Sequence, residues 1–123
     1  MGLNPKPFAP EVGGGGVEMK LLWRNASPTS DFSAQTLTLD LSEYDAAIVS
    51  YAQSRNDGRI SSSILCMKDR SISIGAYRGA SIKRTCEVME TGVKFGDASS
   101  SSGNTNSSIV PYEIFGVKGV ESV

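Results

Sequence analysis

The side chains that could do chemistry in this chain are mainly carboxylates, because the sequence contains no histidine. The Ser-His-Asp and Cys-His nucleophile systems, the common zinc sites and the usual general base near neutral pH are therefore excluded. Paired carboxylates could still hydrolyse a glycosidic bond. Five acidic residues are predicted near turns: Asp57, Asp69, Glu87, Glu90 and Asp97. No pair stands out among them, so the sequence predicts no enzyme, no cofactor and no metal site.

The two cysteines, Cys66 and Cys86, fall on two separate predicted strands. They could face each other across a core, and a disulfide is the alternative to free thiols. Two cysteines in a chain without a signal peptide are more often buried thiols, and we expect that state.

The charge of the chain is nearly balanced, with 12 basic and 13 acidic residues and a net charge of -1. No run of lysine or arginine supplies the basic face that a nucleic-acid binder needs. No apolar run approaches the roughly 20 residues that cross a bilayer. The N-terminus lacks the basic and apolar regions of a signal peptide. We therefore expect a soluble, non-secreted protein that binds neither nucleic acid nor membrane.

The clearest structural pattern runs from Thr36 to Tyr51. Leu37, Leu39 and Leu41 alternate with polar residues, which is typical of a strand with one buried and one exposed face. Residues 44–51 are almost continuously apolar, as in a strand that is covered on both faces. The pattern predicts an edge strand, a tight corner and a central strand.

Further strands are predicted over residues 17–24, 59–67, 71–77, 81–89, 93–95 and 109–118. Turns rich in Gly, Ser and Asn join them, and residues 54–58 are predicted to form a hairpin tip. No segment has a helical period. Seven to eight short strands predict an all-β antiparallel sandwich or jelly-roll-like domain over residues 17–119, followed by a short tail at 120–123.

Three local features add detail to this prediction. Val17, Met19, Leu21 and Trp23 fall on one face of the first strand, so Trp23 is expected in the core or at a subunit interface. Pro111 lacks a backbone donor, which suits an edge strand or a bulge. The Ser/Gly/Asn-rich segment 97–108 predicts a mobile surface loop.

Residues 1–16 differ in composition from the rest of the chain. Three prolines favour an extended backbone, and four consecutive glycines form a flexible joint. One interpretation is a leader without a role. The other is a docking arm whose apolar anchors are Leu3, Phe8 and Val12.

Three stretches carry a family resemblance. Residues 20–45 contain Leu-Leu-Trp, Asn-x-x-Pro-Thr-Ser and Leu-x-x-Tyr-Asp; residues 91–98 contain Gly-Val-Lys-Phe-Gly-Asp; residues 109–118 contain Pro-x-x-Ile-Phe-Gly-Val-Lys. In this order they resemble a small β-domain of tail and tail-fibre proteins from tailed phages and prophages of Gram-positive bacteria. The resemblance spans residues 19–118, is weak between 52 and 91, and replaces the family's closing Tyr-Gly-Ile conservatively.

The resemblance implies a virion protein of the phage tail or surface, made in the cytoplasm of the bacterial host. Its implied partners are other virion tail proteins and further copies of the same chain, with a trimer favoured. It also implies attachment to a glycan of the host surface. The alternative is an architectural subunit, such as a decoration, collar or tail-tip component, that docks through residues 1–16 without binding a receptor.

A glycan site needs aromatic faces together with amide, hydroxyl or carboxylate groups. The predicted loops supply seven candidates for receptor binding: Arg55, Asn56, Asp57, Tyr77, Arg78, Asn104 and Asn106. Each could instead be an ordinary turn residue. Only the arrangement of the loops in space can separate these two interpretations.

Overall fold

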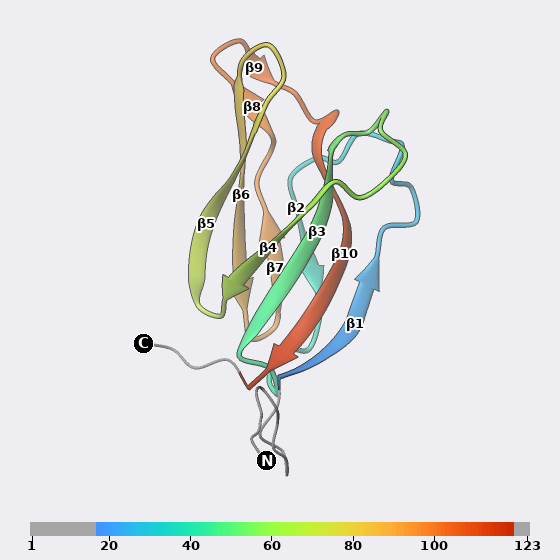
Figure 1. The fold of residues 1–123 in the computed structure, drawn as a ribbon. Coiled ribbons are helices and arrows are strands. Elements are labelled where there is room, and N and C mark those ends of the chain that lie inside the picture. Colours follow the sequence, from blue (N-terminus) through green and yellow to red (C-terminus); the bar gives the residue numbers. More distant parts are fainter. Residues whose placement is uncertain (1–16, 120–123) are drawn as a thin grey trace, which may run out of the picture.

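The computed structural model describes residues 17–119, which form an all-β domain of two antiparallel sheets (Figure 1). The all-β sandwich predicted from the sequence is confirmed. The anchors Leu3, Phe8 and Val12 and the tail 120–123 lie outside the described residues. Among residues 17–119, no helix is long and apolar enough to span a membrane.

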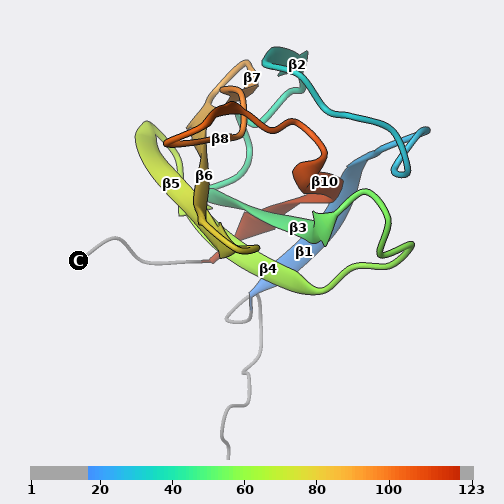
Figure 2. The same cartoon turned by 90° about the horizontal axis from the view of Figure 1, so that it is seen from above.

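The first sheet has four strands in the order β1-β10-β3-β4. Their bounds are β1 Glu18–Arg24, β10 Ser108–Lys118, β3 Ala46–Ser54 and β4 Ser62–Met67. The second sheet has six strands, in the order β2-β7-β6-β8-β9 with β5 on the other edge of β6. Their bounds are β2 Gln35–Thr38, β5 Arg70–Tyr77, β6 Ser81–Met89, β7 Gly92–Phe95, β8 Ser99–Ser100 and β9 Gly103–Asn104. Figure 2 shows β2 and β7 on one side of the core and β1, β3 and β4 on the other.

The core lies between the two sheets and is built from alternate residues of each strand, as the period of two requires. Val49 of β3 and Ile114 of β10 face Val88 of β6 and Phe95 of β7 within one buried cluster. β3 pairs with β10 on one edge and β4 on the other, which confirms the predicted central strand. The edge prediction for Leu37 is also confirmed, since β2 ends the second sheet.

The two cysteines meet in this core. Cys66 of β4 and Cys86 of β6 are fully buried, and their sulfurs lie 3.9 Å apart. Both are free, which confirms the prediction of buried thiols. Mutual contact and burial raise the pKa of the Cys86 thiol, so it is protonated in the folded domain.

A bulge changes the face that the first strand presents. The pairing of β1 with β10 shifts between Leu21 and Trp23, because one extra residue is inserted there. Leu22 and Trp23 therefore both pack against the core, whereas Met19 and Leu21 are exposed. The prediction that residues 17, 19, 21 and 23 share one face is wrong for this reason.

Strand pairing refines two further predictions. Within the segment 97–108, β8 and β9 pair as a short hairpin, and Ala98 and Ser108 near its ends are buried, whereas the mobility expected of this segment stays a prediction. β10 lies inside its sheet, so the edge-strand option for Pro111 is wrong and the bulge option is right. The register with β3 shifts between Pro111 and Glu113.

Candidate functional site

One end of the sandwich, here called the loop end, collects the connections at residues 25–34, 55–61, 78–80 and 96–107 (Figure 1). The other end holds the start of β1 and the end of β10, which pair through Glu18 and Lys118. This arrangement follows from antiparallel pairing, because each hairpin returns the chain to the same end of the sheet. The loop end is therefore the end opposite to both ends of the described chain.

All seven sequence-predicted candidates lie at or next to the loop end, although they come from three separate segments. Arg55, Asn56 and Asp57 form the β3–β4 hairpin tip, Tyr77 and Arg78 end β5, and Asn104 and Asn106 follow the β8–β9 turn. The predicted hairpin at residues 54–58 is confirmed by the pairing of β3 with β4. The fold thus brings to one end three segments that are separated by about twenty residues or more in the sequence.

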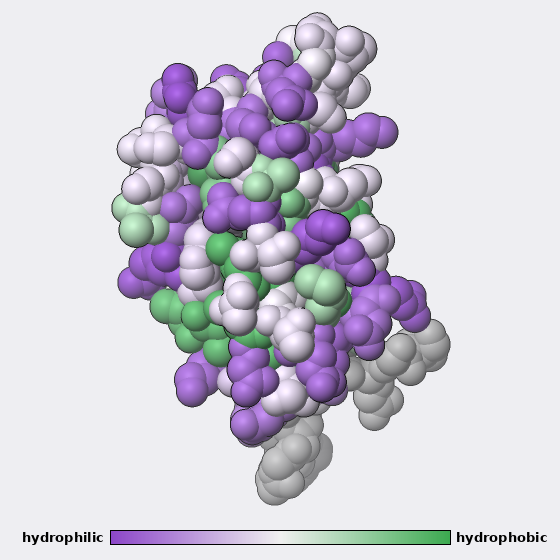
Figure 3. Space-filling view, turned by 180° about the vertical axis from the view of Figure 1, so that it is seen from behind, coloured by the Kyte–Doolittle hydropathy of each residue, from purple (hydrophilic) through white to green (hydrophobic). Residues whose placement is uncertain are grey.

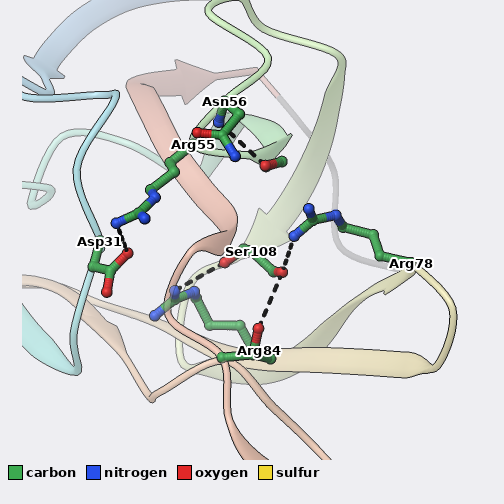
Figure 4. A network of polar contacts seen from close by, with 8 residues as sticks. Asp31, Arg55, Asn56, Arg78, Arg84 and Ser108 are labelled. Atoms are coloured by element: carbon green, nitrogen blue, oxygen red, sulfur yellow. Dashed lines mark hydrogen bonds and ion pairs between the residues drawn. The ribbon is translucent and has the colours of Figure 1, made fainter.

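Two arginines of this set tie neighbouring loops together (Figure 4). The Arg55 guanidinium forms a 2.6 Å ion pair with Asp31 of the β1–β2 loop. The Arg78 guanidinium donates a 2.6 Å hydrogen bond to the Ser108 hydroxyl. Arg55 and Asp31 are about half exposed, so a ligand could compete for either charge.

Three of the candidates form hydrogen bonds within their own loops. The Asp57 carboxylate accepts the backbone N–H of Ser54, and the backbone N–H of Asn56 donates to the Ser54 hydroxyl. The Asn106 side chain accepts from the backbone N–H of Ala98 and donates to Asp97. The turn-residue interpretation therefore describes Asp57 and Asn106 better than ligand binding does.

The carboxylate of Asp97 links this end to the β1–β2 loop. It accepts the backbone N–H of Ala34 at 2.9 Å and the amide of Asn106 at 3.0 Å. These two hydrogen bonds lower the pKa of Asp97, with a smaller contribution from the positive charge of Arg84. Asp97 is thus a structural anion at neutral pH.

Arg84 supports the loop end from within, and it is not among the residues expected from the sequence. Its fully buried guanidinium donates to the carbonyl oxygens of Ile109, Gly96 and Ser108 at 2.8, 2.7 and 3.1 Å. It also lies 5.2 Å from the ring centre of Phe32. Burial lowers the pKa of Arg84 to about 10, so the group stays charged at neutral pH. The alternation of β6 could have located it, since it falls on the buried face.

Tyr77 is the aromatic residue among the seven candidates, and 73% of it is exposed to solvent. It pairs across the strands with Ser81, so both side chains stand on the outer face of the six-stranded sheet. Lys83, the next outward residue of β6, pairs with Gly75 on one side and Ser99 on the other. Beside them lies a hollow lined by Ala80, Ser81, Lys83, Ser99, Ser100 and Ser101.

The chemistry of this hollow suits a sugar that carries an acidic group. The Tyr77 ring offers an apolar plane, the serines offer hydroxyl groups, and the Lys83 ammonium offers a positive charge. Seen from behind, the same sheet is mostly polar over its upper half, toward the loop end (Figure 3). The sequence pattern points to Tyr77 but not to Lys83 or the serines, because only the pairing of β6 with β8 places them side by side.

The five carboxylates considered for hydrolysis do not form a common site. Asp57 and Asp97 hold turns at the loop end, whereas Asp69 lies in the β4–β5 turn and Glu90 in the β6–β7 turn at the other end. Glu87 stands on the outer face of the second sheet, across from Lys94. Among residues 17–119, no three His, Cys, Asp or Glu side chains cluster in a way that could hold a metal ion.

Comparison with protein-family models, with curated proteins and with solved structures gives no match to this chain.

Proposed function

We propose that the protein is a structural component of a phage or prophage virion, associated with the tail or a fibre, that attaches the particle to a host-surface glycan. The resemblance of residues 20–45, 91–98 and 109–118 to tail-protein domains suggests the class of particle. The attachment role is carried by one observation of geometry. The hollow beside Tyr77, lined by Lys83 and the serines, lies at the end of the sandwich opposite to the start of β1 and the end of β10, so a domain held by its termini would present it outward.

The ligand class is inferred from the side chains that line the hollow and from the Tyr77 ring beside it. An exposed ring, four serine hydroxyls and one ammonium favour a glycan with phosphate or carboxylate substituents over a neutral or apolar ligand. Arg78 at the same end adds positive charge, whereas the charge of Arg55 is balanced by Asp31. Attachment of this kind needs many weak contacts acting together, which an oligomer supplies.

The test is binding of the labelled full chain to Gram-positive cell walls and to their purified polysaccharides. We expect saturable binding that the polysaccharide competes. Tyr77→Ala and Lys83→Ala should each weaken it roughly tenfold, the scale of one lost aromatic or charged contact. Arg70→Ala is the matched control, since Arg70 is exposed at the other end of the same strand and should leave binding unchanged.

Absence of saturable binding, even with multivalent display, would overturn the attachment role and favour the architectural alternative. In that alternative the chain docks on another virion protein through residues 1–16, with Leu3, Phe8 and Val12 as anchors. Deletion of residues 1–16 should then abolish incorporation into particles while the domain still folds. Normal incorporation of the deleted chain would rule out this alternative.

A further inference from the structure

The outer face of the four-stranded sheet carries two apolar rows that run across all four strands. The Met19 row pairs Met19 with Val117, Ala46 and Met67, one from each strand. The Leu21 row, two residues further along, pairs Leu21 with Phe115, Ile48 and Leu65 in the same way. Directly paired residues share a face of a sheet, so these eight side chains form one surface, here called the apolar face.

The apolar face points away from the core. None of its eight residues belongs to the buried cluster between the sheets, which takes the alternate residues of the same strands. Val117 and Ala46, at the centre of the Met19 row, are nevertheless buried by their neighbours. Met19, Leu21 and Leu65 are 54%, 38% and 46% exposed. A polar row of Arg24, Glu113, Ser50 and Ser63 bounds the surface, and its members bond to one another across the strands.

The second sheet shows what a solvated outer face looks like in the same domain. The corresponding row there pairs Thr36 with Lys94, Glu87 and Ser71, and all four are polar. This row of the second sheet carries no apolar side chain, whereas both rows of the first sheet are apolar throughout. Contiguous exposed apolar patches of this kind mark interaction sites on soluble proteins.

We propose that a second copy of this chain packs its apolar face against the first, about a two-fold axis that runs between the two rows. The sizes of the side chains in the two rows favour this packing. The Met19 row is small at its centre, where Val117 and Ala46 are only 1% exposed, and the Leu21 row is bulky there, with Phe115 and Ile48. A two-fold axis along the rows places the bulky centre of each copy over the small centre of the other.

The extent of the face favours a weak, reversible association. Four strands about 4.8 Å apart, with the two rows two residues apart along each strand, span roughly 19 Å by 13 Å. Because Val117 and Ala46 are already buried within the chain, the face offers less than the ~800 Å² that each partner contributes to a standard interface. Sheets packed face to face align within about 30°, which keeps the rows of the two copies in contact. The paired charges of Arg24 and Glu113 lie at the rim, where water still reaches them.

This association does not depend on glycan attachment, and it predicts a dimer where the family resemblance implies a trimer. The test is the mass of the full chain in solution, by light scattering and sedimentation equilibrium over a wide concentration range. We expect a reversible dimer. Leu65→Lys and Met19→Lys, on the two edge strands, should each raise the dimer dissociation constant at least tenfold, because two ammonium groups would be buried without partners.

Ser73→Lys is the matched control, since Ser73 is exposed on β5, an edge strand of the other sheet, and should leave the dimer intact. Circular dichroism and thermal unfolding verify that each variant folds. Because Leu65 and Met19 are more than a third exposed, at least one variant should fold normally. A wild-type monomer at every concentration, a trimer, or a dimer that neither lysine affects would overturn the proposal.

A mixing experiment tests the two-fold register itself. The axis places Leu65 of one copy over Met67 of the other. Leu65→Lys and Met67→Glu chains should each remain monomeric alone and form a heterodimer when mixed, because opposite charges then meet across the interface. Failure of the mixture to associate, although the wild type dimerises, would overturn this arrangement of the rows.

Discussion

The Nε of Arg84 donates a 2.8 Å hydrogen bond to the carbonyl oxygen of Ile109, and so one sheet holds a strained residue of the other. Ile109 has a φ of 50°, a left-handed conformation that a β-branched residue rarely adopts and that costs about 1–3 kcal/mol. The same guanidinium binds the carbonyl oxygen of Ser108. Arg84 therefore fixes the start of β10 at the loop end, close to the proposed attachment site.

Loss of Arg84 should destabilise the domain strongly. Arg84→Met keeps much of the buried volume but leaves the carbonyl oxygens of Gly96, Ser108 and Ile109 without this donor. We expect the free energy of unfolding to fall by about 3–5 kcal/mol, measured by urea denaturation. Lys83→Met, on the exposed side of the same strand, should change it by no more than about 0.5 kcal/mol. If both substitutions lowered the free energy of unfolding equally, the stabilising role of the buried Arg84 guanidinium would be contradicted.

A methyl group at position 92 should be poorly tolerated. The Cβ of Gly92→Ala would meet the backbone carbonyl oxygen of Leu37, which the β2–β7 pairing holds in place. We expect a loss of about 1–3 kcal/mol, because the strands must separate to make room. Gly75→Ala is the control, since its Cβ would lie 3.9 Å from the nearest atom and should be neutral or stabilising. Thermal unfolding of both variants measures the difference.

Oxidation should join the two sheets through Cys66 and Cys86. An azo oxidant such as diamide is added while the chain refolds, because the folded domain buries both thiols. It takes two electrons and two protons from the thiols, which become a disulfide while the azo group becomes a hydrazine. The closed loop should stabilise the fold by about 3 kcal/mol in the chain-entropy model. Mass spectrometry should find a monomer that is lighter by two hydrogens. Cys66→Ala should abolish both this mass change and the gain in stability. Intermolecular disulfides alone would contradict the contact seen between the sulfurs.

Acid should weaken the hydrogen bond by which Asp97 holds the β1–β2 loop against the domain. Hydrogen bonds from Ala34 and Asn106 lower the pKa of this carboxylate in the folded state. Its contribution to stability is therefore complete above the unfolded pKa of about 3.9 and is lost as the pH falls through the lower folded value. Asp97→Asn should lower the melting temperature at neutral pH and flatten its fall between about pH 5 and pH 2. If the melting temperatures of the wild type and of Asp97→Asn fell by the same amount with pH, the stabilising role of the Asp97 carboxylate would be contradicted.

Alternation along the chain was sufficient to predict most of the strands and the two-layer class. β6 is an example, since its buried residues Ile82, Cys86 and Val88 all lie on the same side of the two-residue alternation. The same alternation places Arg84 inside, but periodicity does not tell which carbonyl oxygens will receive its hydrogen bonds. Those belong to residues 12 to 25 positions away: the β6–β7 hairpin brings Gly96 near, and the packing of the two sheets brings Ser108 and Ile109 near.

The sequence by itself determined that this protein is an all-β domain with turn-rich connections, because side-chain period and turn chemistry are local properties. Tertiary structure alone decided which faces those strands present. A single bulge beside Leu22 turns Trp23 inward and leaves Met19 and Leu21 outward, and strand order aligns them with Phe115 and Leu65. It also places Tyr77, Lys83 and Ser99 at one end. Register and strand order arise from contacts distant in sequence, so no local pattern contains them.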